Sequence, residues 1–476
     1  MHLRILQTEW EPFAEALCAR QDVESAGVVL AERLPGEDVF LARRLILVPE
    51  EGYLIRRHDQ LRIDPVVFNR LVRPAREHGW SVFTVHTHPR TQRPWFSIAD
   101  DAGDARLMPS LFVQTAGPHG SLVLAGDTHV PAGRVWTSPG DAPETLGFRI
   151  VGQTLQVLPA HAGRCEDPDA AGAWFARQRL ALGAAGQATL RALHVGIVGL
   201  GGTGSVVCMQ LAHLGVGCLT LIDGDRVEAS NVSRIVGARR RDAGTAWKVD
   251  VAARYVAELG LDTELRVLRN HLGDEASLEA VAECDVVLSC VDAHTPRARL
   301  NRLAYTSALP IIDLGSAFRV DAEGRVVAGA GRVVVVGPGR PCLACWGHLD
   351  PARLRLEALA PEERVRLAAE GYVQGAEIPQ PSVIAFNTAV AGAAVVELLR
   401  LVTAFAGADD PPLRLGLDFI SGSVRRNRLV ASTACRICGT GAGPLPEALA
   451  DDGKAAVAGL DLARPTADPE SVMTPQ

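Results

Sequence analysis

Two histidines, a serine and an aspartate lie within one short stretch of the chain. Residues 86–89 read His-Thr-His-Pro, and Ser97 and Asp100 follow them. Histidines at positions i and i+2 of an extended segment point to the same side, so His86 and His88 can bind one ion. With Asp100 they form the kind of three-ligand set that zinc uses when one coordination position stays open for water. The spacing therefore predicts a hydrolytic zinc site, because zinc makes its bound water a usable nucleophile.

A hydrolytic site of this kind also needs a base. Glu24 stands directly before a segment of small and apolar residues, 26–30, that reads as a strand. We expect the Glu24 carboxylate to take a proton from the bound water. The Ser97 hydroxyl would donate a hydrogen bond to the oxyanion that forms when a carbonyl is attacked.

A second chemical motif is a glycine-rich turn in the middle of the chain. The turn follows an apolar strand and contains Gly199, Gly201, Gly202 and Gly204. Glycines permit a tight turn, and they let phosphates approach the backbone N–H groups at the N-terminus of the following helix. On its own, this pattern would equally suit an enzyme that binds a dinucleotide.

Polar residues after the next strand favour a nucleoside triphosphate instead. Asp223 and Asp225 end that strand, and Asp223 is placed for the ribose hydroxyls. Asn231, Arg234 and Lys248 would supply polar and cationic groups to the phosphates. Only two of the 48 basic residues are lysines. Codon bias in a GC-rich genome is the simpler cause, yet the survival of Lys248 favours a role specific to lysine.

Two CxxC pairs offer four thiolates, from Cys342, Cys345, Cys435 and Cys438. In a reducing cytoplasm such pairs favour a metal over disulfides. Two pairs far apart in sequence suit a structural zinc ion that ties the C-terminal strands to the rest of the domain. A redox-active pair is the alternative.

The elements that must position these groups fall into two halves. Residues 1–158 predict a mixed α+β domain, and the turn-rich residues 159–172 predict a linker. Helices are expected at Phe13–Arg20, Phe68–His78 and Ser97–Leu107, the last with Ser97 as its N-cap. Strands are expected at Ala26–Leu30, Val39–Val48, Ser81–His86, Leu111–Gln114 and Ser121–Leu124.

Residues 173–440 alternate strands and helices, which predicts a mainly parallel sheet with helices on both faces. Strands are expected at Val195–Val198, Leu219–Ile222 and Val286–Cys290, and helices at Ser205–Leu214 and Thr245–Leu259. Residues 441–476 are rich in Gly, Ala, Pro and Asp without sustained periodicity, so we expect a disordered tail. The fold class predicted for the whole chain is α/β.

Composition excludes several classes of function. Hydrophobic residues make up 47% and charged residues 22% of the chain, as in soluble globular proteins. The formal charge of −7 argues against a nucleic-acid partner. No apolar run reaches the ~20 residues of a membrane span, and no signal-peptide pattern follows Met1. We therefore expect a cytoplasmic protein without a membrane partner.

The first half resembles the JAB/MPN (JAMM) metallopeptidases. Their pattern is a distant glutamate, then His-[Ser/Thr]-His-Pro, seven residues, and Ser-x-x-Asp, and all of it is present in this sequence. The resemblance implies a JAB/MPN domain over 1–158 that cleaves isopeptide or peptide bonds beside the terminal glycine of ubiquitin-like proteins. A chance His-x-His on a strand, or a JAMM fold without metal, is the alternative.

The second half resembles the ThiF/MoeB/HesA family, whose Rossmann-like adenylation fold is shared with ubiquitin-activating enzymes. The likeness rests on Asp223 to Arg234, with Val232 in place of leucine, and on residues 289–297. It implies ATP as substrate, Asp292 as a magnesium ligand and a structural zinc site in the four cysteines. It also implies a homodimer in which Arg177 reaches the phosphates of the neighbouring subunit. Residues 174–175 depart from the usual Arg-Tyr before that arginine.

Family members that form a thioester carry a nucleophilic cysteine between the two CxxC pairs. The interval from Cys345 to Cys435 contains no cysteine. Ser382 could accept the acyl group as an oxyester, although its place before a helix favours capping. Release of the adenylate directly to a sulfur donor, a partner protein or an amine is the simpler interpretation.

Together these patterns predict a bifunctional bacterial enzyme that acts on a ubiquitin-like or sulfur-carrier protein with a C-terminal glycine. The first domain would trim or remove that protein, and the second would convert its carboxylate and MgATP into an acyl-adenylate and pyrophosphate. Partner enzymes would be a conjugating enzyme in protein modification, or a sulfurtransferase in the biosynthesis of cysteine, thiamine or molybdopterin-like products. A scaffold that binds the carrier without turnover is the third hypothesis.

Overall fold

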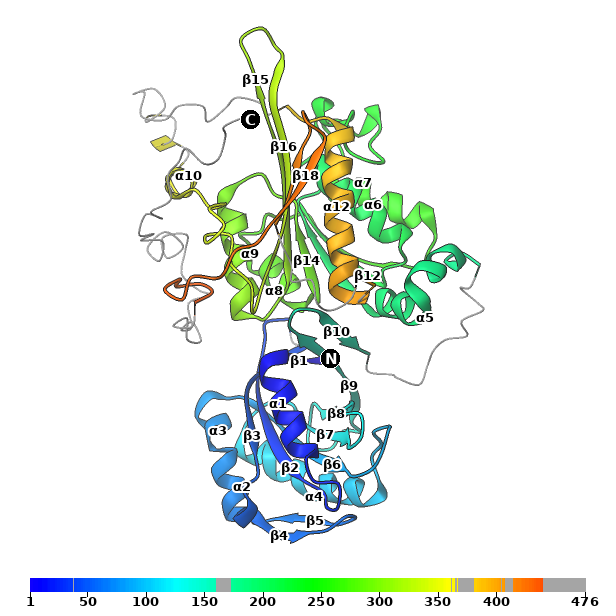
Figure 1. Ribbon diagram of the computed structural model, residues 1–476, viewed down its shortest axis with the longest axis vertical. Helices are drawn as coiled ribbons and strands as arrows, with labels where there is room; N and C mark the ends of the chain where they lie inside the picture. The colour runs from blue at the N-terminus through cyan, green and yellow to red at the C-terminus, as the bar shows by residue number, and fades with distance from the viewer. Residues whose placement is uncertain are drawn as a thin grey trace.

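The computed structural model describes residues 1–36, 38–159, 173–360, 362, 363, 366, 381–403, 405, 406 and 414–439. These residues form two halves, each built on an eight-stranded sheet, and Figure 1 shows the halves stacked along the long axis of the molecule. Nearly all of the predicted linker and the whole predicted tail, 441–476, lie outside the described residues.

The sheet of the first half curls round on itself. Its order is β1-β3-β2-β6-β7-β8-β9-β10, and β1 also pairs with β9. The strands are β1 (His2–Leu6), β2 (Ala26–Arg33), β3 (Val39–Leu47), β6 (Ser81–His88), β7 (His119–Ala125), β8 (Pro131–Trp136), β9 (Glu144–Val151) and β10 (Leu155–Leu158). A separate pair is formed by β4 (Tyr53–Arg56) and β5 (Leu61–Ile63).

The helices of the first half cover both faces of this sheet. They are α1 (Gln7–Cys18), α2 (Pro65–Leu71), α3 (Arg73–His78) and α4 (Ile98–Gln114), with a short 3-10 turn at Glu50–Gly52. Alternate residues of β2 face opposite sides. Val29 packs in the cluster that holds α1, and Val28 in the cluster that holds α3 and α4.

Three of the predicted elements in this half need correction. Phe68–His78 is not one helix, because α2 ends before Val72 and α3 begins after it. Leu111–Gln114 is not a strand, because these residues form the last turn of α4. Leu111 and Met108 stand three residues apart and both enter the same core cluster, which is helical spacing. The first helix begins at Gln7, six residues earlier than predicted, and continues through Pro12.

The second half has a mainly parallel sheet of order β13-β12-β11-β14-β15-β16-β17-β18. The first five strands in this order run parallel, and β16, β17 and β18 are added antiparallel. The strands are β11 (His194–Val198), β12 (Cys218–Ile222), β13 (Glu264–Leu268), β14 (Val286–Ser289), β15 (Ile311–Val320), β16 (Val326–Val336), β17 (Arg414–Asp418) and β18 (Ser423–Asn427).

Helices lie on both faces of this second sheet, as predicted. In Figure 1, α6, α7 and α12 lie on one side of the strands, and α8, α9 and α10 on the other. The helices are α5 (Ala176–Ala192), α6 (Gly202–His213), α7 (Lys248–Leu259), α8 (Glu275–Glu283), α9 (His294–Thr306), α10 (Pro351–Glu357) and α12 (Ile384–Thr403). Short 3-10 turns lie at Ala229–Asn231 and Arg240–Asp242.

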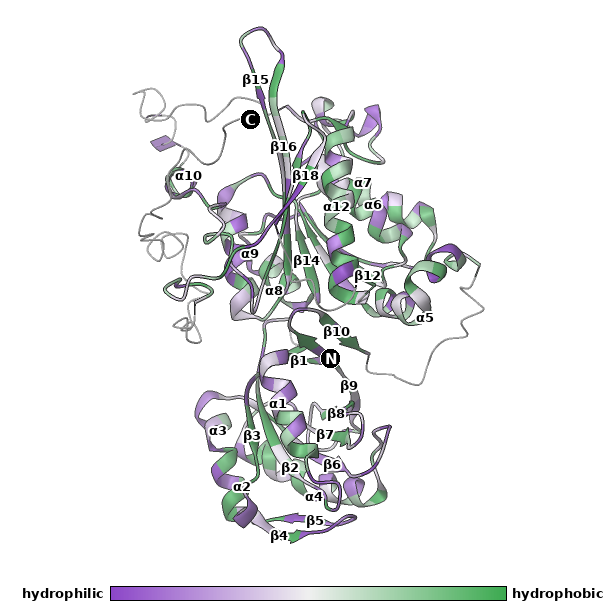
Figure 2. Ribbon diagram, viewed as in Figure 1, coloured by the Kyte–Doolittle hydropathy of each residue, from purple (hydrophilic) through white to green (hydrophobic). Residues whose placement is uncertain are grey.

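By length and composition, α12 is apolar enough to cross a membrane. It packs instead against α6, β15 and β16, and Val390, Ala394 and Leu398 are fully buried there. Figure 2 shows hydrophobic residues along this helix and along the central strands of both sheets. We therefore interpret α12 as a core helix of this sheet.

A buried polar interface joins the two halves. Arg149 of β9 donates from Nε to the Asp285 carboxylate at 2.5 Å, and Asp285 also accepts from the His194 backbone N–H at 2.9 Å. Arg4 of β1 is 1% exposed and donates to the carbonyl oxygens of Cys284 and Ser307, each at 2.8 Å. These contacts attach the first half to the amino ends of β11, β14 and β15.

Candidate nucleotide and metal sites

The glycine turn lies at the carboxyl end of β11, and at least two of its positions leave no room for a Cβ. Gly199 has φ +89°, and a Cβ there would lie 2.8 Å from the Cys290 carbonyl oxygen. A Cβ on Gly204 would lie 1.8 Å from the carbonyl oxygen of Gly199. Gly201 is the N-cap of α6, so the turn delivers the chain directly to a helix N-terminus. Backbone N–H groups at such a terminus bind phosphates.

Asp223 holds this turn in place. One carboxylate oxygen accepts from the Leu200 N–H at 2.7 Å, and the other accepts from the Asp225 N–H at 2.8 Å. Burial raises the pKa of Asp223, which is 9% exposed, while Lys248 lowers it. The predicted contact with a ribose is untested, and the structure adds a role for Asp223 in ordering the turn.

Lys248 reaches the same place from the start of α7. Its Nζ lies 2.7 Å from Asp225 and 3.9 Å from Asp223. The side chain is 15% exposed, so its ammonium group is held near the end of β12 rather than free in solvent. An ammonium group in this position can neutralise phosphate charge at the glycine turn.

Arg234 and an asparagine that the sequence analysis missed lie over Gly202. A Cβ on Gly202 would lie 2.4 Å from Nδ2 of Asn387 and 3.2 Å from Cδ of Arg234. Asn387 comes from the first turn of α12, is 1% exposed and donates to the Ser382 hydroxyl at 3.1 Å. No motif marks Asn387, because only the packing of α12 on α6 brings it to the turn.

Asn231 and Ser382 make contacts within the protein. The Asn231 side chain accepts from the Glu228 N–H at 3.3 Å and caps a short 3-10 turn. Ser382 lies two residues before α12 and accepts from Asn387, so its hydroxyl orients that asparagine. Residues 367–380, which precede Ser382, lie outside the described residues.

Asp292 stands in the loop between β14 and α9, beside the glycine turn. Arg297 fixes this loop, since its guanidinium donates to the Val291 carbonyl oxygen at 2.6 Å. Arg297 also donates from Nε to Asp313 at 2.8 Å, and the Ser289 hydroxyl donates to the same carboxylate at 3.0 Å. Ser289 stands where the ThiF resemblance has an aspartate, and in this chain its hydroxyl contacts the Asp313 carboxylate of β15.

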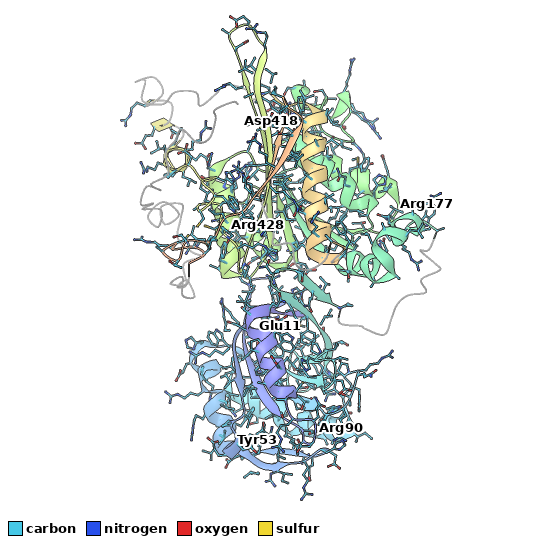
Figure 3. The ribbon with its side chains drawn as sticks, viewed as in Figure 1. Glu11, Tyr53, Arg90, Arg177, Asp418 and Arg428 are labelled. Atoms are coloured by element: carbon cyan, nitrogen blue, oxygen red, sulfur yellow. The ribbon has the colours of Figure 1, made fainter. Side chains whose placement is uncertain are left out.

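Arg177 lies far from the other predicted nucleotide-binding residues of its own chain. It is exposed at the start of α5, and Figure 3 shows it at the periphery of the second half. The neighbouring Trp174 and Leu180 are 76% and 84% exposed. The structure therefore does not bring Arg177 to the glycine turn within one chain.

The four predicted cysteines converge. Cys342 lies 3.8 Å from Cys345 and 3.7 Å from Cys435, and Cys345 lies 3.5 Å from Cys438. All four sulfur atoms lie within 4.8 Å of one another. These spacings suit four thiolates around a single tetrahedral zinc ion.

The predicted ligands of the first half also converge. Nε2 of His86 lies 3.3 Å from Nε2 of His88 and 3.0 Å from Oδ1 of Asp100, and His88 lies 3.4 Å from Oδ2. His88 is 7% exposed, and Trp95 packs edge-on against its ring at 4.9 Å. Two imidazole nitrogens and one carboxylate at these distances fit a zinc ion that keeps a position for water.

Glu24 and Ser97 flank these ligands. His86, His88 and Asp100 all influence the pKa of Glu24, which burial raises most strongly. Ser97 is the N-cap of α4, as predicted, and its hydroxyl accepts from the Asp100 N–H at 3.2 Å. Its role toward an oxyanion stays a prediction.

Arg56 of β4 positions the segment that carries Glu24. It donates to the Glu24 carbonyl oxygen at 3.0 Å and to the Ser25 hydroxyl at 2.7 Å. The arginine stacks on Tyr53, whose hydroxyl accepts from the Ala26 N–H.

The two candidate sites lie at opposite ends of the molecule. The first half attaches to the amino end of β11, whereas the glycine turn follows its carboxyl end. Leu34, just after β2, packs against the second half, while His86 pairs with Ala26 at the other end of β2. The path from one site to the other runs along β2, which has eight residues, and then along β11, which has five. At a rise of about 3.3 Å per residue, the two sites are roughly 40 Å apart.

The glycine turn, the carboxylates after β12 and the basic residues around them define a nucleotide-binding α/β domain. Residues 175–437 match the ThiF family, a span of more than half of the chain. The chain therefore belongs to the ThiF family. This match begins after the first half, so it lends no support to the JAB/MPN resemblance of residues 1–158.

Two fungal relatives illustrate the similarity. The chain is 32% identical over 231 residues to the adenylyltransferase and sulfurtransferase uba4 of Aspergillus niger, which covers 48% of this chain and 44% of the relative. It is 30% identical over 303 residues to the protein of the same name from Aspergillus fumigatus, and this match covers 62% of this chain and 57% of the relative. The chain spans about half the length of the curated relatives it matches. Neither relative is bacterial, so the expected bacterial origin gains no support from them.

Solved structures of two proteins show weaker similarity. Escherichia coli MccB with ATP shares 19% identity, covers 56% of this chain and 74% of that one, and has a TM-score of 0.44. PaaA shares 21% identity, covers 56% and 84%, and has a TM-score of 0.41.

Proposed function

We propose that the second half activates the C-terminal carboxylate of a small ubiquitin-like sulfur-carrier protein by adenylation. Membership of the ThiF family supports the adenylation, and the names of the uba4 relatives, which join adenylyltransferase to sulfurtransferase, favour sulfur transfer over protein modification. The single observation that carries the proposal is the convergence of Lys248 and Arg234 on the glycine turn.

In the proposed reaction, a carboxylate oxygen of the carrier attacks the α-phosphorus of ATP. An acyl–oxygen–phosphorus bond forms, the bond from the α-phosphorus to the bridging oxygen breaks, and pyrophosphate leaves. Lys248 and Arg234 stabilise the charge that develops on the phosphates. Asp292 would hold magnesium, which neutralises phosphate charge when bound. A homodimer would add Arg177 of the partner subunit.

Pyrophosphate exchange tests this proposal. Purified protein should incorporate labelled pyrophosphate into ATP only when a glycine-ended carrier protein is present. Asp292→Asn and Lys248→Ala should each lower the exchange rate by about a hundredfold or more, since each removes charge stabilisation from the phosphates. Exchange at the wild-type rate in both variants would refute the assigned roles.

For the first half, we propose zinc-dependent hydrolysis beside the carrier's terminal glycine. The convergence of His86, His88 and Asp100 next to Glu24 favours this second function. Those three residues would hold the zinc ion, whose bound water would be the nucleophile, and Glu24 would take the water's proton. Glu24→Gln should retain the metal but fail to trim a carrier that is extended beyond its glycine. Normal trimming by Glu24→Gln would refute the hydrolase assignment.

A further inference from the structure

Four arginines lie beside the Asp292 loop, on the face of the second sheet that α9 covers in part. Register pairs Gly315 with Arg332, Arg332 with Gly416, and Gly416 with Arg425. Residues directly opposite one another share a face of the sheet, so the two glycines and two arginines of this register form a row across β15 to β18. Arg414 precedes Gly416 by two residues and faces the same way. Together with Arg297 of α9, the arginines Arg332, Arg414 and Arg425 form what we call the arginine face.

Positive charge exceeds negative charge on this face. Asp313 pairs with Arg297 at 2.8 Å and with Arg332 at 3.0 Å. Nε of Arg414 is buried and has no hydrogen-bond partner among the described residues. Burial, reinforced by Arg332, Arg414 and Arg297, lowers the pKa of His348 to about 3, so this neighbouring ring adds no charge of its own. Asp418, two residues after Gly416 on the same face, lies near Arg425. Two carboxylates therefore face four guanidinium groups, and the excess of positive charge favours an anion.

The floor between these arginines is bare backbone. No described atom lies within 4 Å of the place where a Cβ on Gly416 would stand. The atoms nearest to a Cβ on Gly315 are guanidinium nitrogens of Arg297 and Arg332, at 3.8 and 3.9 Å. Glycine within a strand often marks a place where another backbone approaches closely. An extended peptide can therefore lie against this part of the sheet.

The arginine face begins where the carrier's terminus would react. Arg297 donates to the carbonyl oxygen of Val291, the residue before Asp292, and to Asp313 on the face itself. Strands lie about 4.8 Å apart, so β17 stands roughly 14 Å from β14. An extended chain covers that distance in about four residues.

We propose that the arginine face binds an acidic side chain of the carrier protein, about three to five residues before its C-terminal glycine. The charge excess selects a carboxylate over a neutral or basic group, and the glycines admit the peptide backbone that carries it. Arg414 is the main determinant, because its half-buried guanidinium group forms no ion pair with a carboxylate among the described residues, whereas Arg297 and Arg332 both pair with Asp313. This inference rests on the proposed adenylation and names the substrate that it favours.

Binding of short synthetic peptides tests the inference. Two fluorescein-labelled peptides end in Gly-Gly and differ only at the fourth to sixth positions from the C-terminus, which hold Glu in one and Lys in the other. The wild-type protein should bind the Glu peptide about tenfold more tightly or better, because each charge-assisted hydrogen bond contributes that much. Arg414→Gln should remove most of this preference, and Arg414→Glu should reverse it.

Controls separate a local effect from unfolding and from the proposed function. Arg106→Gln removes an exposed arginine of α4 and should leave the preference unchanged. Thermal melting should show that both Arg414 variants fold. A folded Arg414→Glu protein that still prefers the Glu peptide would overturn the inference. Pyrophosphate exchange without any peptide preference would overturn it and leave the proposed function intact. Preference for the Glu peptide, without pyrophosphate exchange for any glycine-ended carrier, would support peptide binding at the arginine face and refute adenylation.

Discussion

Replacing Asp285 with alanine should separate the unfolding of the two halves of the chain. Asp285 is 1% exposed, pairs with Arg149 at 2.5 Å and accepts from the backbone of His194. Arg4 lies in the same interface and is fully buried. Alanine would leave Arg149 and Arg4 without the carboxylate that balances their charge.

The expected cost follows from the pKa of Asp285. Burial alone would raise it, but Arg149, His2 and the hydrogen bonds hold it at about 2, below its ordinary value of 3.8. That shift corresponds to about 2 kcal/mol of stability. Because the folded-state pKa is lowered, this contribution is present above pH 3.8 and disappears as the pH falls toward 2. Removing one member of a buried pair costs about 3 to 5 kcal/mol, since the remaining charge stays buried.

Urea unfolding followed by tryptophan fluorescence and circular dichroism measures this loss. The wild type should unfold in one main transition, whereas Asp285→Ala should show an earlier transition and lower midpoint. Glu77→Ala removes an exposed pair with Arg73 and should leave the unfolding midpoint close to that of the wild type. Arg149→Met combined with Asp285→Leu should recover part of the loss. Equal midpoints for Asp285→Ala and Glu77→Ala would refute the role of this interface.

The other predictions concern the metal and nucleotide sites. Cys345→Ser should lower the zinc content by one equivalent and lower the melting temperature, as mass spectrometry of the metal and calorimetry can show; unchanged zinc would contradict the four-thiolate site. His88→Ala should remove the zinc ion of the first half, also one equivalent, without changing pyrophosphate exchange. Loss of exchange together with that zinc ion would mean that the two sites are coupled. Gly202→Ala should weaken ATP binding about tenfold or more in calorimetric titration, because its Cβ would lie 2.4 Å from Asn387; wild-type affinity would show that the turn can shift. Arg177→Ala should lower pyrophosphate exchange if Arg177 acts on the partner subunit of a dimer. Loss of exchange in a protein that sediments as a monomer would contradict action across subunits.

Local patterns were enough to predict the elements that carry the nucleotide site. The strands β11, β12 and β14 and the helices α6 and α7 lie close to their predicted bounds, because apolar runs and glycine turns alternate there. The three metal ligands of the first half were found in the same way, since their spacing is encoded within one strand and the next helix turn.

Contacts between distant residues could not be predicted. Asn387 reaches Gly202 only because α12 packs on α6, and Asp313 meets Arg297 only because α9 packs on β15. Arg4 and Arg149 lie on strands of the first half, but their side chains bond to residues of the second half. The helix α4 was predicted to end at Leu107, but it continues through Pro109 to Gln114. Tertiary packing decided each of these cases.

Carrier-dependent pyrophosphate exchange is the most direct test of the central claim that this chain activates a C-terminal carboxylate. The wild-type protein with a glycine-ended sulfur-carrier protein, ATP and magnesium should exchange labelled pyrophosphate, and the same carrier without its last glycine should not support exchange. A protein that binds both ATP and the carrier but exchanges no pyrophosphate would be a scaffold, and that result would contradict the claim.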